Sequence, residues 1–432
     1  MNKSTLKDLT QKIGSGATPN GGQSAYHDTG ISFIRSQNVY DFKFSNNGLA
    51  FIDDKQANEL DNVEVFAGDI LLNITGDSIA RVCMVPNHIL PARVNQHVSI
   101  IRANSKIDRN YLLCYLVNLK PYLLKICGVG GTRNALTKEA IGKLNIYFPE
   151  KLTQEKIGNL VSHLNSKISL NNRINAELEA MAKTIYDYWF VQFDFPFDFS
   201  QGKPHKNGRR SETAELKPYK SSGGKMVWNE ELKREIPEGW EVRSLYDIAN
   251  YINGLACQKY RPLKDDDAYY KVIKIKEMND GISANTERVR MDIPLKYIIS
   301  DGDVLFSWSA TLDVKIWSEG VGALNQHIFR ITSEEYPRTF YFFELSNYLS
   351  HFKMMAELRK TTMGHITIDH LKTSFISVPP QSLVQKIDQV IKPILDKVVK
   401  AKKENQQLAS LRDWLLPMLM NGQVTVKDEA KA

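Results

Sequence analysis

Few residues of the kind that build metal sites or disulfide frameworks occur in this sequence. Its four cysteines are far apart and form no CxxC pair, and there is neither a His-x-x-x-His pattern nor a cluster of carboxylates. Structural zinc sites and disulfide-rich folds need closely spaced ligands or paired cysteines. We therefore interpret Cys83, Cys114, Cys127 and Cys257 as reduced core residues of a cytoplasmic protein, and we expect this chain to bind no metal.

Long apolar runs and a strong net charge are also missing. The most apolar stretch, residues 111–130, is interrupted by polar residues and a proline, whereas a membrane-spanning helix needs about 20 apolar residues. Residues 1–14 are polar and mixed in charge, unlike a signal peptide. The net charge of +7 permits an anionic partner without requiring one. These features predict a soluble, cytoplasmic chain of several domains with no membrane contact.

The sequence lacks a glycine-rich loop of the type that binds S-adenosylmethionine or nucleotide phosphates. The segment Gly128-Val129-Gly130-Gly131 is not followed by Lys-Ser or Lys-Thr. The segment Val378-Pro379-Pro380-Gln381 has neither the Asn or Asp before the prolines nor the aromatic residue after them that adenine methyltransferases carry. We interpret these segments as a loop and a helix start. The chain is therefore expected to bind no cofactor and to have no catalytic residues.

What the sequence does contain is an internal repeat. The triplet Asn-Gln-His at residues 95–97 recurs at residues 325–327, an offset of 230. That offset relates matching residues over roughly ninety positions, which indicates duplication rather than similar composition. Upstream the offset drifts, since Gly68-Asp69 matches Gly302-Asp303 at 234. Loops can absorb such insertions, so the constant offset downstream marks a segment whose length matters.

Residues 1–150 and 236–380 are predicted to be two mixed α/β domains. Strands and a helix are expected in the segments 31–35, 69–74, 97–102 and 108–126, the last broken at Pro121. These segments lie between turn-forming residues, and the second half repeats their order. The predicted architecture is therefore a pseudo-two-fold repeat of two globular domains.

Residues 151–190 and 381–425 are predicted to be two long helices, the second ending in a short tail. Their seam residues recur at alternating steps of four and three, as in a coiled coil. The two seams comprise Ile157, Val161, Leu164, Ile168, Asn175, Leu178 and Ile185, and Ile387, Ile391, Ile394, Val398, Asn405, Leu408 and Leu415. Asn175 and Asn405 are equivalent, and a buried pair of these residues would fix the register. We expect antiparallel pairing of the two helices; an internal bundle or a dimerisation rod is the alternative.

The linker, residues 191–235, begins with four phenylalanines at every second position, a spacing typical of an extended segment. A loop rich in Gly, Lys and Ser follows. Two interpretations of the aromatic residues in this region remain open: anchors for a partner protein, or a cap on the chain's own core. The residues concerned are Tyr186, Tyr188, Trp189, Phe193, Phe195 and Phe197.

Several segments together resemble the DNA-sequence specificity subunits of Type I restriction–modification systems. They are Tyr186-Asp187-Tyr188-Trp189-Phe190 at the end of the first helix, Ser221-Ser222-Gly223-Gly224 running into Ile236-Pro237-Glu238-Gly239-Trp240, and Val378-Pro379-Pro380 before the second helix. The resemblance covers essentially the whole chain. In two places the first repeat departs from the second: it has no equivalent of residues 237–240, and it has Phe148-Pro149-Glu150 in place of the double proline.

The resemblance implies an α+β architecture in which two α/β target recognition domains are separated by two long antiparallel helices. Each domain would bind one half of a bipartite target in double-stranded DNA. The helices would set the gap between the halves and dock two methyltransferase subunits. Those subunits would use S-adenosylmethionine to methylate adenine, and restriction subunits of the full complex would use ATP and Mg²⁺. This chain would be the non-catalytic subunit.

Arg, Lys, Asn and Gln side chains read base edges, and Lys and Arg also meet phosphates. We therefore chose as DNA-binding candidates the polar residues that follow predicted strands or fill loops at matching places. In the first domain they are Arg35, Gln37 and Asn38; Thr75, Ser78 and Arg81; and Thr132, Arg133 and Asn134. In the second they are Lys274 and Lys276; Ser307, Trp308, Ser309 and Thr311; and Thr361, Thr362 and His365. Each of them could instead be an ordinary loop residue.

The repeated Asn95-Gln96 and Asn325-Gln326 pairs are interpreted differently. Domains that read different bases should differ where they contact those bases, so an identical motif favours a structural role or a contact with the DNA backbone. We favour the structural role.

Two other functions are alternatives to DNA-sequence specificity. A two-domain protein-interaction scaffold would show no salt-sensitive DNA binding, whereas contacts with phosphates give a steep salt dependence. A methyltransferase acting alone would bind S-adenosylmethionine.

Overall fold

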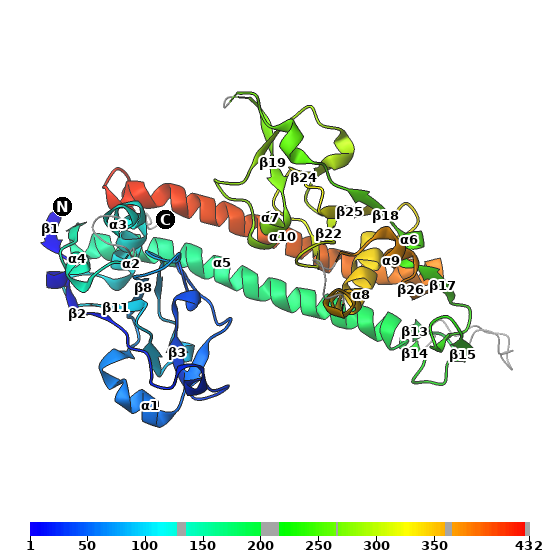
Figure 1. Ribbon diagram of the computed structural model, residues 1–432, viewed down its shortest axis with the longest axis horizontal. Coiled ribbons are helices and arrows are strands. Elements are labelled where there is room, and N and C mark those ends of the chain that lie inside the picture. The colour runs from blue at the N-terminus through cyan, green and yellow to red at the C-terminus, as the bar shows by residue number, and fades with distance from the viewer. Residues whose placement is uncertain (128–134, 200–215, 265–266, 359–364, 428–432) are drawn as a thin grey trace, which may run out of the picture. The chain divides into compact units, whose positions relative to one another are not determined.

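The computed structural model describes residues 1–127, 135–199, 216–264, 267–358 and 365–427. The chain forms two compact units. Unit 1 contains residues 1–169 and 407–432, and unit 2 contains residues 170–406. Figure 1 labels their helices and strands. Unit 1 thus includes the end of the second long helix. The predicted division had treated that helix as a segment separate from the first domain.

Unit 1 is built on two four-stranded sheets. The first is antiparallel and has the order β2 (Thr10–Ser15), β11 (Val98–Ala103), β8 (Ile70–Asn73), β9 (Val82–Met84). The second has the order β6 (Ala50–Ile52), β3 (Ile31–Ile34), β10 (Ala92–Val94), β7 (Glu64–Val65), and its central strands β3 and β10 run parallel. A further pair joins β1 (Asn2–Thr5) to β12 (Asn145–Phe148). The three strands predicted from residues 31–35, 69–74 and 97–102 are confirmed to within a residue or two.

The helical part of unit 1 shows one correction. The predicted helix at 108–126 is two helices, α2 (Arg109–Asn118) and α3 (Lys120–Cys127). The break falls at Leu119, and Pro121 lies in the first turn of α3, where its missing N–H leaves no hydrogen bond unmade. Asp108 caps α2 by accepting the Tyr111 N–H at 2.9 Å. Two further short α-helices described in unit 1 are α1 (Asp54–Glu59) and α4 (Lys138–Gly142).

Unit 2 repeats the two four-stranded sheets and the outer strand pair, whereas the short pair of β4 (Val39–Tyr40) with β5 (Lys43–Phe44) is described in unit 1 alone. Its sheets have the orders β18 (Asn250–Asn253), β25 (Ile328–Thr332), β22 (Val304–Ser307), β23 (Asp313–Ile316), and β20 (Arg288–Arg290), β19 (Tyr269–Ile273), β24 (Gly322–Leu324), β21 (Ile298–Ile299). The parallel pair is now β19 with β24, and β17 (Glu241–Ser244) pairs with β26 (Phe375–Val378). Helices α6 (Leu245–Ile248), α7 (Ile275–Asp280), α8 (Arg338–Leu358) and α9 (Ile368–Lys372) complete the unit. The duplication predicted from the offsets is therefore a duplication of topology.

The Gly-Asp dipeptides that match between the two halves, Gly68-Asp69 and Gly302-Asp303, have the same structural role in both units. Asp69 accepts the Phe66 N–H at 2.7 Å and receives the Arg102 guanidinium at 2.8 Å. Asp303 does the same with the Ser300 N–H at 2.7 Å and Arg330. The preceding glycines have φ of +89° and +95°, a region that strains other residues. In both units the dipeptide thus makes a tight turn and anchors a partly buried arginine.

The two long helices are α5 (Lys151–Tyr186) and α10 (Gln381–Met420). They run antiparallel within each unit. In unit 1 Arg412 donates to Asn165 at 2.8 Å, and in unit 2 Lys402 pairs with Glu179 at 2.8 Å (Figure 1). Every predicted seam residue is buried or half-buried. The predicted antiparallel pairing and seam are confirmed.

The predicted pairing of Asn175 with Asn405 is wrong. Asn405 accepts a hydrogen bond from Asn171 at 2.9 Å and donates one to Asn172 at 2.9 Å. Asn175 is buried, and its amide atoms meet no hydrogen-bond partner in the part of the chain that the structure describes. In an antiparallel pair of repeated helices, equivalent residues of the two repeats lie opposite each other at only one level along the pair. Asn175 lies away from that level, and Asn171, about one turn earlier in α5, lies opposite Asn405 instead.

The linker aromatics belong to the core of unit 2. Phe193 and Phe195 are 3% and 5% exposed, and their rings lie 5.2 and 5.7 Å from that of Trp240. Short strands β13 (Pro196–Phe197) and β14 (Lys217–Pro218) pair beside them, and β15 (Met226–Asn229) pairs with β16 (Arg234–Pro237). Tyr186 is also fully buried, whereas Tyr188 is exposed. For Tyr186, Phe193 and Phe195 the interpretation as a cap on the chain's own core is confirmed.

Candidate nucleic-acid interface

The parallel strand pair of unit 1 brings two predicted motifs to one edge. Ile34, the last residue of β3, is in register with Val94, the last residue of β10. Arg35 follows the first strand and Asn95 the second, and the Asn95 N–H donates to the Ile34 carbonyl at 2.9 Å. The carboxyl ends of parallel strands point to the same edge, where open sheets commonly bind ligands.

The loop after β8 reaches the same edge. The Thr75 hydroxyl lies 2.6 Å from Nδ1 of His97, and the Asn73 amide donates to the Ser36 carbonyl at 2.8 Å. Three segments far apart in the sequence therefore converge. We call this set the unit 1 edge and define it as Arg35, Gln37, Thr75, Ser78, Arg81, Gln96 and His97.

The cations of the unit 1 edge are half-exposed and held in place. The Arg35 guanidinium donates to the Gly48 carbonyl at 2.7 Å and lies 5.4 Å from the Tyr26 ring. Arg81 lies 4.7 Å from the ring of Tyr40, which is itself exposed. A cation over an aromatic face loses fewer conformations on binding, because its side chain is already oriented.

One prediction for unit 1 needs correction, and one group of residues lies outside the described structure. Asn38 is fully buried; it accepts the Arg35 N–H at 2.9 Å and donates to the Ser45 and Asn47 carbonyls. Its amide holds the loop together and is not available to a base. Thr132, Arg133 and Asn134 fall in residues 128–134, which the structure does not describe.

Unit 2 forms the matching edge with different side chains. Asn325 donates its N–H to the Ile273 carbonyl at 3.0 Å, so Lys274 and the second Asn-Gln-His triplet lie side by side. The Lys274 ammonium pairs with Glu287, and this contact lowers the pKa of the Glu287 carboxyl. Lys276 is exposed. We define the unit 2 edge as Lys274, Lys276, Trp308, Gln326, His327 and His365.

Trp308 is the centre of the unit 2 edge. Its ring lies 5.7 Å from His327 and 5.4 Å from His365, and its indole N–H donates to Asn253 at 3.2 Å. The backbone N–H of Trp308 donates to the His327 carbonyl, as that of Ile74 does to His97. Trp308 therefore occupies the place of an aliphatic residue in unit 1, and the two edges present different chemistry on one scaffold.

Two more predictions for unit 2 are wrong. Ser307 is fully buried and its hydroxyl donates to the Thr311 carbonyl at 2.6 Å. Ser309 is 4% exposed. Both belong to the strand end rather than to the surface, whereas Thr311 is exposed. Thr361 and Thr362 lie outside the described residues.

The repeated triplet divides into a buried and an exposed part. The Asn95 side chain accepts the His97 N–H at 3.1 Å, and the Asn325 side chain accepts the His327 N–H at 3.4 Å. The structural role is therefore confirmed for the two asparagines. His97 and His327 are exposed at the edges, and reasoning from the sequence left them out; their identity in both halves was the signal that could have found them.

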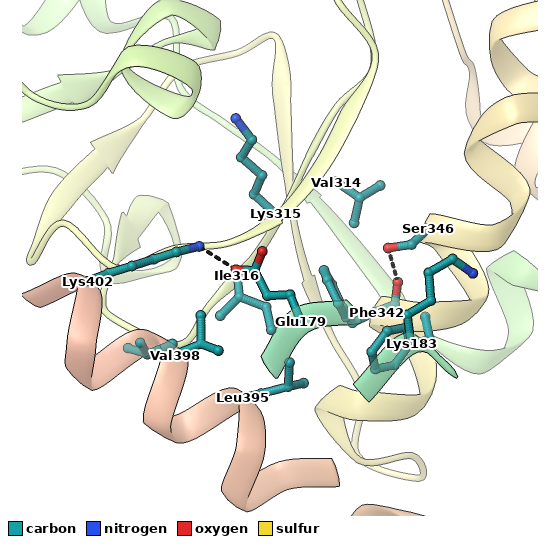
Figure 2. Close-up of a pocket in the computed structure, with 12 residues that line it drawn as sticks. Glu179, Lys183, Val314, Lys315, Ile316, Phe342, Ser346, Leu395, Val398 and Lys402 are labelled. Carbon is teal, nitrogen blue, oxygen red and sulfur yellow. Dashed lines mark hydrogen bonds and ion pairs between the residues drawn. The ribbon is translucent and has the colours of Figure 1, made fainter. Parts of the chain in front are cut away.

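A cavity in unit 2 lies elsewhere. It has a volume of about 320 Å³ and is bounded by α5, α8, α10 and β23. Figure 2 shows lining residues from these elements, among them Glu179, Phe342 and Leu395. Its walls are largely apolar, Lys402 pairs with Glu179 at 2.8 Å, and Lys183 donates to Asn347 at 2.8 Å. None of the edge residues lines this cavity. Within the described ranges there is no group of His, Cys, Asp and Glu that could hold a metal ion, and no helix is long and apolar enough to cross a membrane.

Comparison with known proteins agrees with this geometry. The sequence model of the Type I restriction modification DNA specificity domain matches residues 1–180 and again residues 237–411. The chain belongs to this family. It is a DNA specificity subunit, and each match contains one of the two edges.

Curated relatives extend over nearly the whole specificity subunit. The chain is 24% identical over 437 residues to the Type I restriction enzyme MjaIX specificity subunit of Methanocaldococcus jannaschii, covering 98% of this chain and 93% of the relative. It is 24% identical to the HindI specificity subunit of Haemophilus influenzae, covering 91% and 94%. The crystal structure of the S subunit from M. genitalium has the same fold, with a TM-score of 0.56, 13% identity and coverage of 97% and 95%.

Proposed function

We propose that each edge reads one half of a bipartite site in double-stranded DNA. The observation that carries this proposal is the pair of edges themselves, which share strand order and turn geometry but differ in the side chains presented. Arg35 and Lys274 stand at equivalent positions, as do Ile74 and Trp308. A common scaffold with different contacting residues is what a reader of two different half-sites requires, because base edges differ in their donors and acceptors.

The helices α5 and α10 would then set the gap between the half-sites and dock two methyltransferase subunits. In this proposal the chain is the non-catalytic subunit. The methyltransferase subunits bind S-adenosylmethionine and methylate adenine, and the restriction subunits use ATP and Mg²⁺. The two relatives are specificity subunits of Type I restriction enzymes, and this supports the division of labour.

Substitutions at one edge are expected to change one half of the recognised motif. Arg81→Ala should relax the half read by unit 1, and Lys276→Ala should weaken the binding of the half read by unit 2. A base contact is worth about 1–3 kcal/mol, or roughly five- to 150-fold in affinity. The measurement is a genome-wide map of adenine methylation by each variant with its methyltransferase partner. Lys55→Ala, on an exposed position of α1, is the control and should leave the map unchanged.

The outcome that contradicts this assignment is a change in both halves with either variant. Loss of an edge residue in one unit would then act through the whole complex rather than through one reader.

An exposed apolar stripe on α5 is expected to dock the methyltransferase. Leu170, Ile174 and Met181 are 42%, 40% and 45% exposed and follow one another at steps of four and seven along one side of α5. Exposed apolar patches of this kind mark protein interfaces. The double variant Ile174→Glu, Met181→Glu should weaken binding of the methyltransferase about 100-fold or more, as loss of interface hot spots does. Binding is measured by titrating the methyltransferase subunit against labelled chain.

The matched control places the same charges on other exposed leucines. Leu263 and Leu295 are 81% and 82% exposed and lie on neither α5 nor α10, so Leu263→Glu with Leu295→Glu should leave binding unchanged. Equal loss in both double variants would mean that added charge, not the stripe, controls assembly.

A further inference from the structure

Both edges present a Gln-His pair at the surface of the same turn. The asparagines of the triplets are 8% and 2% exposed and close the turn with their side chains. The next two residues point outward: Gln96, His97 and His327 are exposed, and Gln326 is half-exposed. Burial explains why the asparagine occurs in both halves, but it does not explain why Gln and His follow it in both.

The turn that presents each pair is closely packed and is built in the same way in both units. Gly16 donates its N–H to the Val98 carbonyl at 3.0 Å, and Gly254 donates to Ile328 at 3.1 Å. A Cβ atom on Gly16 would lie 2.0 Å from the Val94 carbonyl oxygen, and one on Gly254 would lie 2.2 Å from that of Asn325. Only glycine permits this approach, so a neighbouring backbone segment packs directly against the turn in both places.

The surroundings of the pair differ between the units. His97 meets the Thr75 hydroxyl at 2.6 Å. His327 instead faces the Trp308 ring and lies 3.3 Å from the Gln326 amide. Each edge therefore combines the same Gln-His pair, on the same kind of turn, with neighbours that differ between the two units.

We propose that the Gln-His pairs bind the sugar-phosphate backbone of each half-site and fix the register in which the variable neighbours meet the bases. This inference rests on the proposed reading of one half-site by each unit. The backbone is the part of DNA that is the same whatever the sequence, so two readers of different bases can share a contact only there. Imidazole and amide N–H groups donate to phosphate oxygens. Because the turn is held in place before DNA arrives, little conformational freedom is lost on binding.

The variants His97→Ala and His327→Ala, singly and together, test the proposal in the complete complex with methyltransferase subunits. Affinity is measured by fluorescence anisotropy for the duplex identified by methylation mapping and for a duplex with both half-sites scrambled. Each single variant should lower affinity for both duplexes by the same factor, about tenfold, as loss of a hydrogen bond to a charged group does. The methylated motif should stay the same. His351→Ala, at an exposed position of α8, is the matched control and should change neither affinity.

Several results would overturn the inference. A relaxed motif with little loss on the scrambled duplex would make the histidines base readers. Unchanged DNA affinity with weaker assembly of the methyltransferase would make the pairs a protein contact. No change in either property would leave the pairs without this role. If His97→Ala unfolds, Gln96→Ala, at an equally exposed position, should still reduce affinity for both duplexes. Failure of the proposed half-site reading can be told apart from failure of this inference. In that case Arg81→Ala would leave the methylated motif unchanged.

Discussion

Removal of residues 165–171 together with residues 405–411 is expected to shorten the recognised gap by about three base pairs and to leave both half-sequences unchanged. Seven helical residues span about 10 Å, and a base pair rises about 3.4 Å. Complexes with this variant should methylate a new set of genomic sites and should lose methylation at the original ones. Mapping of methylated adenines measures both effects at once.

The two deletions are chosen so that the helix pair remains in register. Each removes one heptad, so the seam spacing continues across the junction. Asn171 and Asn405, which bond to each other at 2.9 Å, leave together. In the unaltered chain Arg412 donates to Asn165 at 2.8 Å. After the deletions Asn172 directly follows Leu164 and takes the position of Asn165 opposite Arg412. The junction therefore keeps an amide opposite this arginine.

The control removes residues 165–171 alone. The seam of α5 is then one heptad shorter than that of α10, and the pairs beyond the deletion lose their partners. This variant should unfold at a lower temperature and should methylate poorly at every gap length. If the double deletion instead altered the half-sequences while the gap stayed fixed, the helices would not be the spacer.

Trp240→Ala is expected to lower the free energy of unfolding of unit 2 by about 3–5 kcal/mol, the usual cost of deleting a large buried aromatic side chain. Trp240 is 8% exposed, and its ring lies 5.2 Å from Phe193 and 5.7 Å from Phe190. The linker residues would lose the surface on which they pack. Urea unfolding followed by circular dichroism measures the change.

The same substitution at an exposed tryptophan of unit 2 is the control. Trp228 is 54% exposed, and its indole N–H donates to Glu230 at 3.0 Å. Trp228→Ala should change the free energy of unfolding by no more than about 0.5 kcal/mol. Equal losses for the two variants would contradict the assignment of the linker aromatics to the core.

Sequence patterns located the edges better than they identified the contacting residues. Arg35 and Lys274 were placed at strand ends, and both lie at the edges, because hydrophobic runs mark where strands stop. Asn38 and Ser307 satisfied the same rule and are buried. Nothing in their position along the chain distinguishes a polar side chain that satisfies the loop's own backbone from one that faces solvent. That distinction depends on carbonyl groups several residues away, such as those of Ser45 and Thr311.

The histidines of the triplets show the opposite error, because the interpretation of the repeated motif covered only its Asn-Gln pairs. The structural role favoured for those pairs holds for the asparagines, whose side chains accept the histidine N–H groups. Exposure separates the three residues of each triplet, and exposure depends on the glycine-supported turn beneath them. The packing of residue 16 against residues 94 and 95 is a contact between distant segments that no local pattern encodes.

By itself the sequence determined the duplication, the two seams and the ends of the main strands, because periods of two and of about three and a half residues state which face of an element is buried. Only the tertiary structure decided what buries it. The parallel pairing of β3 with β10, the packing of Leu416 and Leu419 in the core of unit 1, and the pairing of Asn405 with Asn171 rather than with Asn175 are choices of partner. Partners are selected by the fit of surfaces distant along the chain, and a hydrophobic pattern carries no record of that fit.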